Sequence, residues 1–151
     1  MKLELRKQWG GLPLWARWAL AAYLIGFLVG TRTHVLDVAR GGIHAYSVFP
    51  QVPLQVLFVS LVVIDPLVIV LVGLVRREGI WLAGAVMVLD VCGNWWGNWQ
   101  WLRDDPSQVL RLLPLTLFGV FIVASLPPLH RLVARTSIAS SPSRGSRGWQ
   151  G

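Results

Sequence analysis

The sequence predicts an all-α polytopic membrane protein, a bundle of four transmembrane helices, and its composition and apolar patterning both favour this class. Hydrophobic residues make up 54% of the 151 residues and charged residues only 14%, whereas soluble domains contain about 25% charged residues. The apolar residues are gathered in four stretches, each long enough to cross the hydrocarbon core of a bilayer as a helix. The lipid bilayer is therefore the first partner that we expect.

The first predicted span covers residues 13–36. It begins at Pro13, because proline is well suited to the first position of a helix. Gly41 and Gly42 lie beyond its far end and are expected to stop the helix, since glycine readily adopts the backbone conformations that follow a helix C-terminus. A long loop, 37–51, then leads to the second span.

The second and third predicted spans, 52–75 and 80–99, are joined by a tight turn at 76–79. Pro66 follows Asp65 directly inside the second span, where a proline removes one backbone donor and kinks the helix. The freed carbonyl would lie at the same depth as the carboxylate.

The fourth predicted span, 107–127, begins after Asp105, which can cap it, and ends before a pair of prolines. Residues 1–135 are thus expected to form one transmembrane domain. The Ser-, Arg- and Gly-rich tail, 136–151, is expected to be a disordered basic segment, because it lacks the apolar residues needed for a core.

The net charge of +7 predicts a topology rather than nucleic-acid binding. No glycine-rich phosphate loop, RNA-binding motif or zinc-finger spacing accompanies it, so no nucleic acid is expected as a partner. Ten of the fourteen basic residues lie on one predicted side, which places both termini in the cytoplasm: Lys2, Arg6, Lys7, Arg17, Arg76, Arg77, Arg131, Arg135, Arg144 and Arg147. Twelve of the fourteen are arginines, which is typical of bacteria with GC-rich genomes and favours the inner (plasma) membrane as the location.

Two acidic residues, Asp65 and Asp90, fall near the middle of consecutive predicted spans. A carboxylate at that depth costs several kcal/mol, so it tends to face a bundle interior or a wet cavity. At about 1.5 Å per residue, both reach a similar depth on neighbouring antiparallel helices. Asn94 lies one turn from Asp90 and can orient it. If the carboxylates face each other, one is expected to stay protonated.

A second polar group is predicted at the outer end of the first span. His34, Asp37 and Arg40 share one face at a spacing of three residues, and Arg111 lies at the same predicted side. His34, Asp37 and Arg111 are candidate ligand contacts at a mouth over the bundle. The alternatives are a solvated row of ion pairs and a snorkelling arginine. The spacing matches no strong zinc pattern, so we predict neither a metal site nor a cofactor.

These residues predict a cavity, lined by acids, that binds a small hydrophobic or cationic ligand. Three other hypotheses stay open: a small proton-coupled transporter working as a homodimer, a lipid or sterol-type isomerase, and a scaffold subunit of a membrane complex. Asp65 and Asp90 could also simply hold helices together by pairing with a neighbouring Arg or Asn. Whether the protein is an enzyme is therefore left open.

Some local strings occur in an order that is found in a known family. Tyr23 precedes the acidic Asp37 at the end of the first span, and the second and fourth spans add Leu57-Phe58, Leu61-Val62, Pro66 and Leu113-Pro114-Leu115. With its four spans and long first loop, the chain resembles the EXPERA group, the membrane family of emopamil-binding protein and the sigma-2 receptor. The resemblance implies a buried cavity for an apolar, amine-bearing or sterol-like molecule. Ser60 stands where that family has an acidic residue, and Asp65 is displaced from that position.

Overall fold

The computed structural model describes Arg6 and residues 8–139, which are mostly helical and contain no strand. Four of the described helices are long and apolar enough to cross a membrane, which confirms the predicted all-α, four-helix fold class. They are α2 (Leu14–Gly41), α3 (Val52–Gly73), α4 (Arg77–Gly97) and α6 (Val109–Ala139). Three short helices lie in the connections: η1 (Gly42–His44), α5 (Trp99–Asp104) and η2 (Pro106–Gln108).

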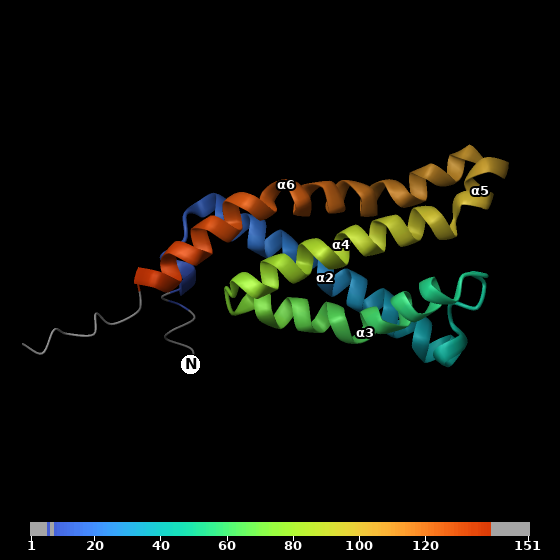
Figure 1. Ribbon diagram of the computed structural model, residues 1–151, viewed down its shortest axis with the longest axis horizontal. Helices are drawn as coiled ribbons and strands as arrows, with labels where there is room; N and C mark the ends of the chain where they lie inside the picture. Colours follow the sequence, from blue (N-terminus) through green and yellow to red (C-terminus); the bar gives the residue numbers. More distant parts are fainter. Residues whose placement is uncertain (1–5, 7, 140–151) are drawn as a thin grey trace, which may run out of the picture.

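The four long helices run antiparallel in chain order, and the main packing contacts are between consecutive ones: α2 with α3, α3 with α4, and α4 with α6 (Figure 1). The described start of the chain and the last turns of α6 lie at one end of the bundle, here called the terminal end. The helices η1, α5 and η2 lie at the other end, here called the loop end. Helix α2 crosses the bundle diagonally, so it meets α6 near the terminal end and lies beside α3 at the loop end.

The exterior of the bundle is apolar, as expected for helices that face lipid. Large side chains such as Trp18 and Val63 are 70% and 71% exposed. Because lipid tails are as apolar as leucine, such faces need no protein cover. The interior is filled by side chains from all four helices, including Tyr23, Leu61, Ile80 and Ile122, which are fully buried.

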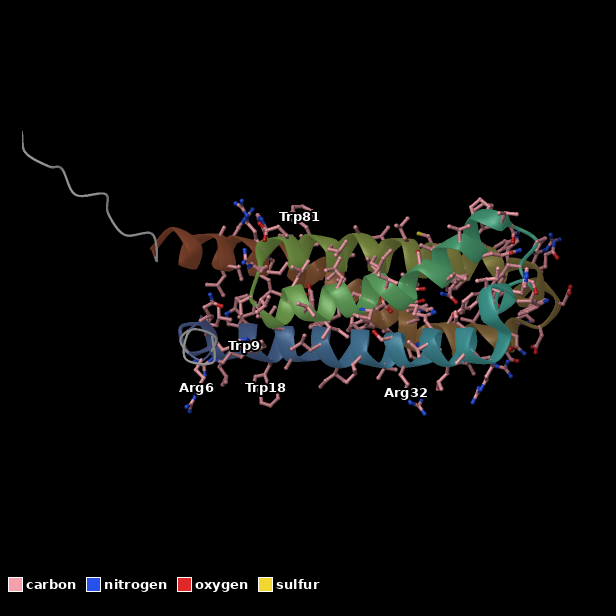
Figure 2. The ribbon with its side chains drawn as sticks, turned by 90° about the horizontal axis from the view of Figure 1, so that it is seen from below. Arg6, Trp9, Trp18, Arg32 and Trp81 are labelled. Atoms are coloured by element: carbon pink, nitrogen blue, oxygen red, sulfur yellow. The ribbon has the colours of Figure 1, made fainter. Side chains whose placement is uncertain are left out.

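Exposed tryptophans gather near both ends of the bundle. Figure 2 shows Trp18 and Trp81 projecting from opposite sides of the bundle on the terminal side. Trp96, Trp99 and Trp101 are exposed at the loop end. Tryptophan favours the two membrane–water interfaces, where its amphipathic ring suits the headgroup region. The two groups therefore mark the expected borders of the membrane.

Helix α2 is longer than the predicted span, because it continues beyond 36 to Gly41. The helix ends where the two glycines were expected to stop it. Gly42 adopts a φ of 60°, a conformation that suits glycine, and its N–H still bonds to the Val38 carbonyl. The added turns bring Asp37 onto the helix rather than into the loop.

The turn between α3 and α4 was predicted at 76–79, and this placement is wrong. Helix α4 already begins at Arg77, and the chain reverses around Val75, whose φ is 52°. Gly79 explains how the helices meet so early: a Cβ at this position would lie 2.7 Å from the Leu71 backbone. The missing side chain lets α4 begin directly against the end of α3.

The prediction that the fourth span ends before the proline pair is also wrong. Helix α6 continues through Pro127 and Pro128 to Ala139. Each proline removes one N–H donor, a loss that membrane helices tolerate when neighbouring groups bind the backbone. The carbonyls that lose their helical partner are those of Val123 and Ala124. The neighbouring Ile122 carbonyl accepts a bond from the Tyr23 hydroxyl at 2.9 Å.

The boundary between the transmembrane domain and the C-terminal tail is therefore later than predicted, because α6 extends to Ala139. Residues 136–139 were assigned to the disordered tail, but they form the last turn of α6. The rest of the predicted tail, 140–151, lies outside the described residues. At the other end of the helix, the expected cap is present: the Asp105 carboxylate accepts a bond from the Ser107 N–H at 3.0 Å, although it caps η2 first.

Candidate functional site

Asp65 is a buried carboxylate in the middle of α3, with only 4% of its surface exposed. Its Oδ2 atom faces Gly30 of α2, where a Cβ would lie 3.0 Å from it. Among the described residues, no hydrogen-bond donor or basic side chain reaches this carboxylate within bonding distance. The position of the Asp65 side chain is therefore set by close packing against α2 rather than by a hydrogen bond or an ion pair.

Asp90 of α4 is half-buried and has a polar partner on its own helix. The Asn94 side-chain amide donates to Asp90 Oδ1 at 2.9 Å and to its carbonyl at 3.0 Å. The Asn98 amide donates in turn to the Asn94 carbonyl at 2.8 Å. The expected orienting role of Asn94 is thus visible in the geometry, and a line of amides extends from Asp90 toward the loop end.

In the structure, Asp65 and Asp90 lie close enough for their charges to interact. The charge of Asp90 acts on Asp65, and both charges act on Tyr46. Tyr46 lies in the loop between α2 and α3, so three separate parts of the chain meet here. We call Asp37, Asp65, Asp90 and Tyr46 the acid cluster.

Tyr46 joins two of the predicted outer residues. Its hydroxyl donates to Asp37 Oδ2 at 3.2 Å and lies 2.8 Å from His34 Nδ1. Since the hydroxyl proton goes to Asp37, the imidazole must donate through Nδ1–H. His34 and Asp37 are therefore held together by a third residue rather than by contact with each other.

Aromatic rings enclose this hydrogen-bonded group. Phe58 of α3 stacks on His34 with ring centroids 6.3 Å apart, and it contacts the rings of Tyr46 and Phe49, each at 5.3 Å. Burial raises the pKa of Tyr46 above its usual value, and the negative charges of Asp37, Asp90 and Asp65 raise it further. The Tyr46 hydroxyl consequently keeps its proton across the physiological pH range.

No Lys or Arg side chain forms an ion pair with the acid cluster within the described part of the chain. The ion pair found there, Arg77–Glu78, lies at the terminal end. Arg32 and Arg40 are exposed on α2, and Figure 2 shows Arg32 projecting away from the bundle. Across the described residues, no three His, Cys, Asp or Glu side chains are grouped closely enough to hold a metal ion.

Arg111 is separate from the acid cluster. It is exposed and lines a small pocket of about 70 Å³ at the loop end, formed by Asn98, Trp101, Leu102, Gln108, Arg111 and Leu112. None of the three aspartates lines this pocket. The charge of Arg111 acts on Asp105 instead. Hydrogen bonds thus join His34 and Asp37 through Tyr46, and Asn94 to Asp90. Asp65 is related to Asp90 and Tyr46 by charge alone, and Arg111 lies apart.

Tyr46 is the residue that sequence reasoning did not select as part of a site. Its only signal was its place in a loop beside a histidine, which does not show that the loop folds back over the helices. Comparisons with protein-family models, curated proteins and solved structures find no match to this chain. The resemblance to the EXPERA group accordingly stays a prediction.

Proposed function

We propose that the acid cluster binds a small apolar molecule that carries a positive charge. The observation that supports this proposal is that Asp65 and Asp90 lie within two apolar helices and that no Lys or Arg among the described residues forms an ion pair with them. A charge without a partner in a low-dielectric interior is costly. A bound cation would reduce that cost, so ligand charge is expected to contribute strongly to binding. The resemblance to the EXPERA group implies the same class of ligand.

Access to the acid cluster is proposed from the lipid, between the loop-end halves of α2 and α6. The ring contacts between these helices, Tyr23–Phe121 and Phe27–Phe118, lie on the terminal side of Gly30. Beyond them α2 crosses toward α3 (Figure 1). Asp90 is only half-buried, which is consistent with access from this side.

The proposal is tested with two probes of the same shape: benzyltrimethylammonium and its uncharged carbon analogue, neopentylbenzene. Purified protein in nanodiscs should bind the ammonium compound in preference to the hydrocarbon. Asp65→Asn and Asp90→Asn should each weaken ammonium binding by about tenfold or more, because the Coulomb attraction is lost in a poorly screened site. Asp104→Asn, at an exposed acid outside the cluster, is the matched control. Unchanged binding in both cluster variants, with native helical content, would contradict the proposal.

A second candidate is proton-coupled transport, and the hydrogen-bonded group at the loop end favours it. His34, Tyr46 and Asp37 form a continuous chain of exchangeable protons next to Asp65 and Asp90. In liposomes with an imposed K⁺ diffusion potential, an interior pH dye should then report proton movement. This movement should disappear in Asp65→Asn and slow several-fold in Tyr46→Phe. If the native protein causes no change in interior pH, proton transport is excluded and ligand binding remains as the proposed function.

The proposed location is the inner (plasma) membrane of a bacterium, with the terminal end in the cytoplasm. Arg6 is exposed at that end (Figure 2), and so are Arg76 and Arg77 at the start of α4. Positively charged residues are enriched on the cytoplasmic side of membrane proteins. The acid cluster would then lie closer to the outer face, and ligand would reach it from the outer leaflet or from the periplasm.

A further inference from the structure

The loop-end pocket that contains Arg111 has the features of a binding site distinct from the acid cluster. It is lined by one cation, Arg111, by the two amides of Asn98 and Gln108, and by apolar side chains. Its volume is about 70 Å³, and on the same measure a cavity needs about 10–15 Å³ to hold one water molecule. The pocket therefore accommodates the small polar end of a molecule rather than a whole organic ligand.

Arg111 is free to bind an anion. No carboxylate forms an ion pair with it among the described residues. Asp105 is the nearby acid whose charge acts on Arg111, but other groups already hold its oxygens. Ser107 donates to Oδ1 at 2.7 Å, and the Gln108 amide donates to Oδ2 at 2.7 Å. The N–H groups of the Arg111 guanidinium are thus available as donors, and their planar arrangement suits two phosphate oxygens.

Each of the two amides keeps a side-chain carbonyl oxygen that can accept a hydrogen bond. The Asn98 NH₂ group donates to the Asn94 carbonyl and the Gln108 NH₂ group donates to Asp105, which leaves both side-chain carbonyl oxygens to accept. Together with the negative charge of Asp105, these oxygens favour a group that carries N–H donors and a positive charge. The same pocket therefore offers a cation for an anionic group and carbonyl oxygens for a donor-bearing cation.

The surroundings of the pocket indicate a lipid as the source of these groups. Trp99 and Trp101 are exposed at this end, as expected at a membrane–water interface. Leu110, Leu113 and Leu117 of α6 are also exposed, at helical spacing below the pocket. Acyl chains can lie along these leucines while the headgroup reaches the pocket.

We propose that this pocket binds the phosphoethanolamine headgroup of a membrane lipid, with Arg111 on the phosphate and the Asn98 and Gln108 carbonyls on the ammonium. Phosphatidylcholine is the matched comparison, because its quaternary ammonium has the same charge but no N–H to donate. The proposal does not depend on the ligand of the acid cluster.

The test is native mass spectrometry of the full-length protein with equimolar phosphatidylethanolamine and phosphatidylcholine of identical acyl chains. The ethanolamine lipid should be retained about tenfold more than the choline lipid, as expected for the loss of one or two hydrogen bonds to a charged group. Arg111→Gln should reduce retention of both lipids about tenfold, through loss of the phosphate contact. Arg103→Gln, at an exposed arginine of the same end that does not line the pocket, should leave retention unchanged.

Three outcomes would overturn the proposal. The first is equal retention of the two lipids by the native protein, and the second is an equal effect of Arg103→Gln and Arg111→Gln. The third is displacement of the lipid by equimolar soluble glycerophosphoethanolamine, which would assign the pocket to a soluble phosphate ester. Asp65→Asn should retain the preference for the ethanolamine lipid. Loss of ammonium binding at the acid cluster and loss of lipid retention at this pocket can therefore be measured independently.

Discussion

Tyr46 and Gly30 are the two residues that organise the acid cluster without carrying charge. The Tyr46 hydroxyl holds His34 and Asp37 in one hydrogen-bonded group. Gly30 leaves room for the Asp65 carboxylate, since a Cβ there would lie 3.0 Å from Oδ2. Tyr46 therefore contributes hydrogen bonds to the cluster, and Gly30 leaves the space that the Asp65 carboxylate occupies.

Replacing Tyr46 by phenylalanine should destabilise the protein by about 1–3 kcal/mol, because the buried His34 Nδ1 and Asp37 would lose their shared partner. The measurement is the free energy of unfolding in detergent. A double-mutant cycle with Asp37→Asn should show coupling between the two positions. Additive effects would mean that the Tyr46–Asp37 bond contributes nothing to stability.

Tyr46 should also make stability depend on alkaline pH. Its pKa is raised in the folded protein, chiefly by burial, whereas an unfolded tyrosine ionises at about pH 10. Below that pH both states hold the proton and the stabilisation is complete. Above it the unfolded state alone releases the proton, so stability falls as pH rises. Unfolding measured on both sides of pH about 10 should show a shallower alkaline loss in Tyr46→Phe; an identical slope would contradict this assignment.

At the scale of elements, close approach of backbones decides where the helices begin and end. Gly79 lets α4 start against the Leu71 backbone, and Gly42 ends α2. The proline pair has no such effect on α6, since the helix runs through it. Proline is a weaker stop inside a membrane bundle than in water, because the apolar surroundings favour continued backbone hydrogen bonding.

Gly79→Ala should destabilise the α3–α4 pair by about 1–3 kcal/mol, because the new methyl group would meet backbone atoms that cannot move aside cheaply. Gly73→Ala is the matched control. A Cβ at Gly73 would meet only the Leu24 side chain, at an ordinary distance of 4.0 Å. Thermal unfolding of both variants in the same detergent checks this prediction. An equal change in Tm in both variants would show that the close contact at Gly79 does not determine stability.

At the scale of the whole molecule, the four spans place the described chain start and the end of α6 at the same end of the bundle (Figure 1). The tryptophans exposed at both ends fit a bilayer around the bundle. The acid cluster lies toward the loop end, since Tyr46 comes from the loop after η1. The molecule is therefore asymmetric along the membrane normal, and its orientation decides which compartment the cluster faces.

Labelling with a membrane-impermeant maleimide tests the proposed orientation. In a Cys92→Ser background, Asp104→Cys at the loop end should react in intact cells, whereas Arg77→Cys at the terminal end should react only after permeabilisation. Both positions are exposed, so a difference in labelling reports the side of the membrane. The reverse pattern would invert the topology and place the acid cluster toward the cytoplasm.

The sequence by itself determined the class of the protein and the approximate positions of its spans. Apolar length and local backbone chemistry act within one segment, so they can be recognised without knowing the neighbours. The helix limits near Val75 and Pro127 were less predictable, because the first depends on how closely α4 approaches α3 and the second on the surroundings of the proline pair. Helix counting also suggested a common depth for Asp65 and Asp90, since the rise per residue is fixed.

Only the tertiary structure decided which of the polar residues share a site. It placed the loop residue Tyr46 between His34 and Asp37, and it separated Arg111 from the acids. The physical reason is that a side chain's partners depend on how α2 crosses the bundle and how the loop folds back. Neither the crossing nor the fold of the loop is encoded in the periodicity of any one helix, whereas the cost of a carboxylate in lipid is a property of the residue itself.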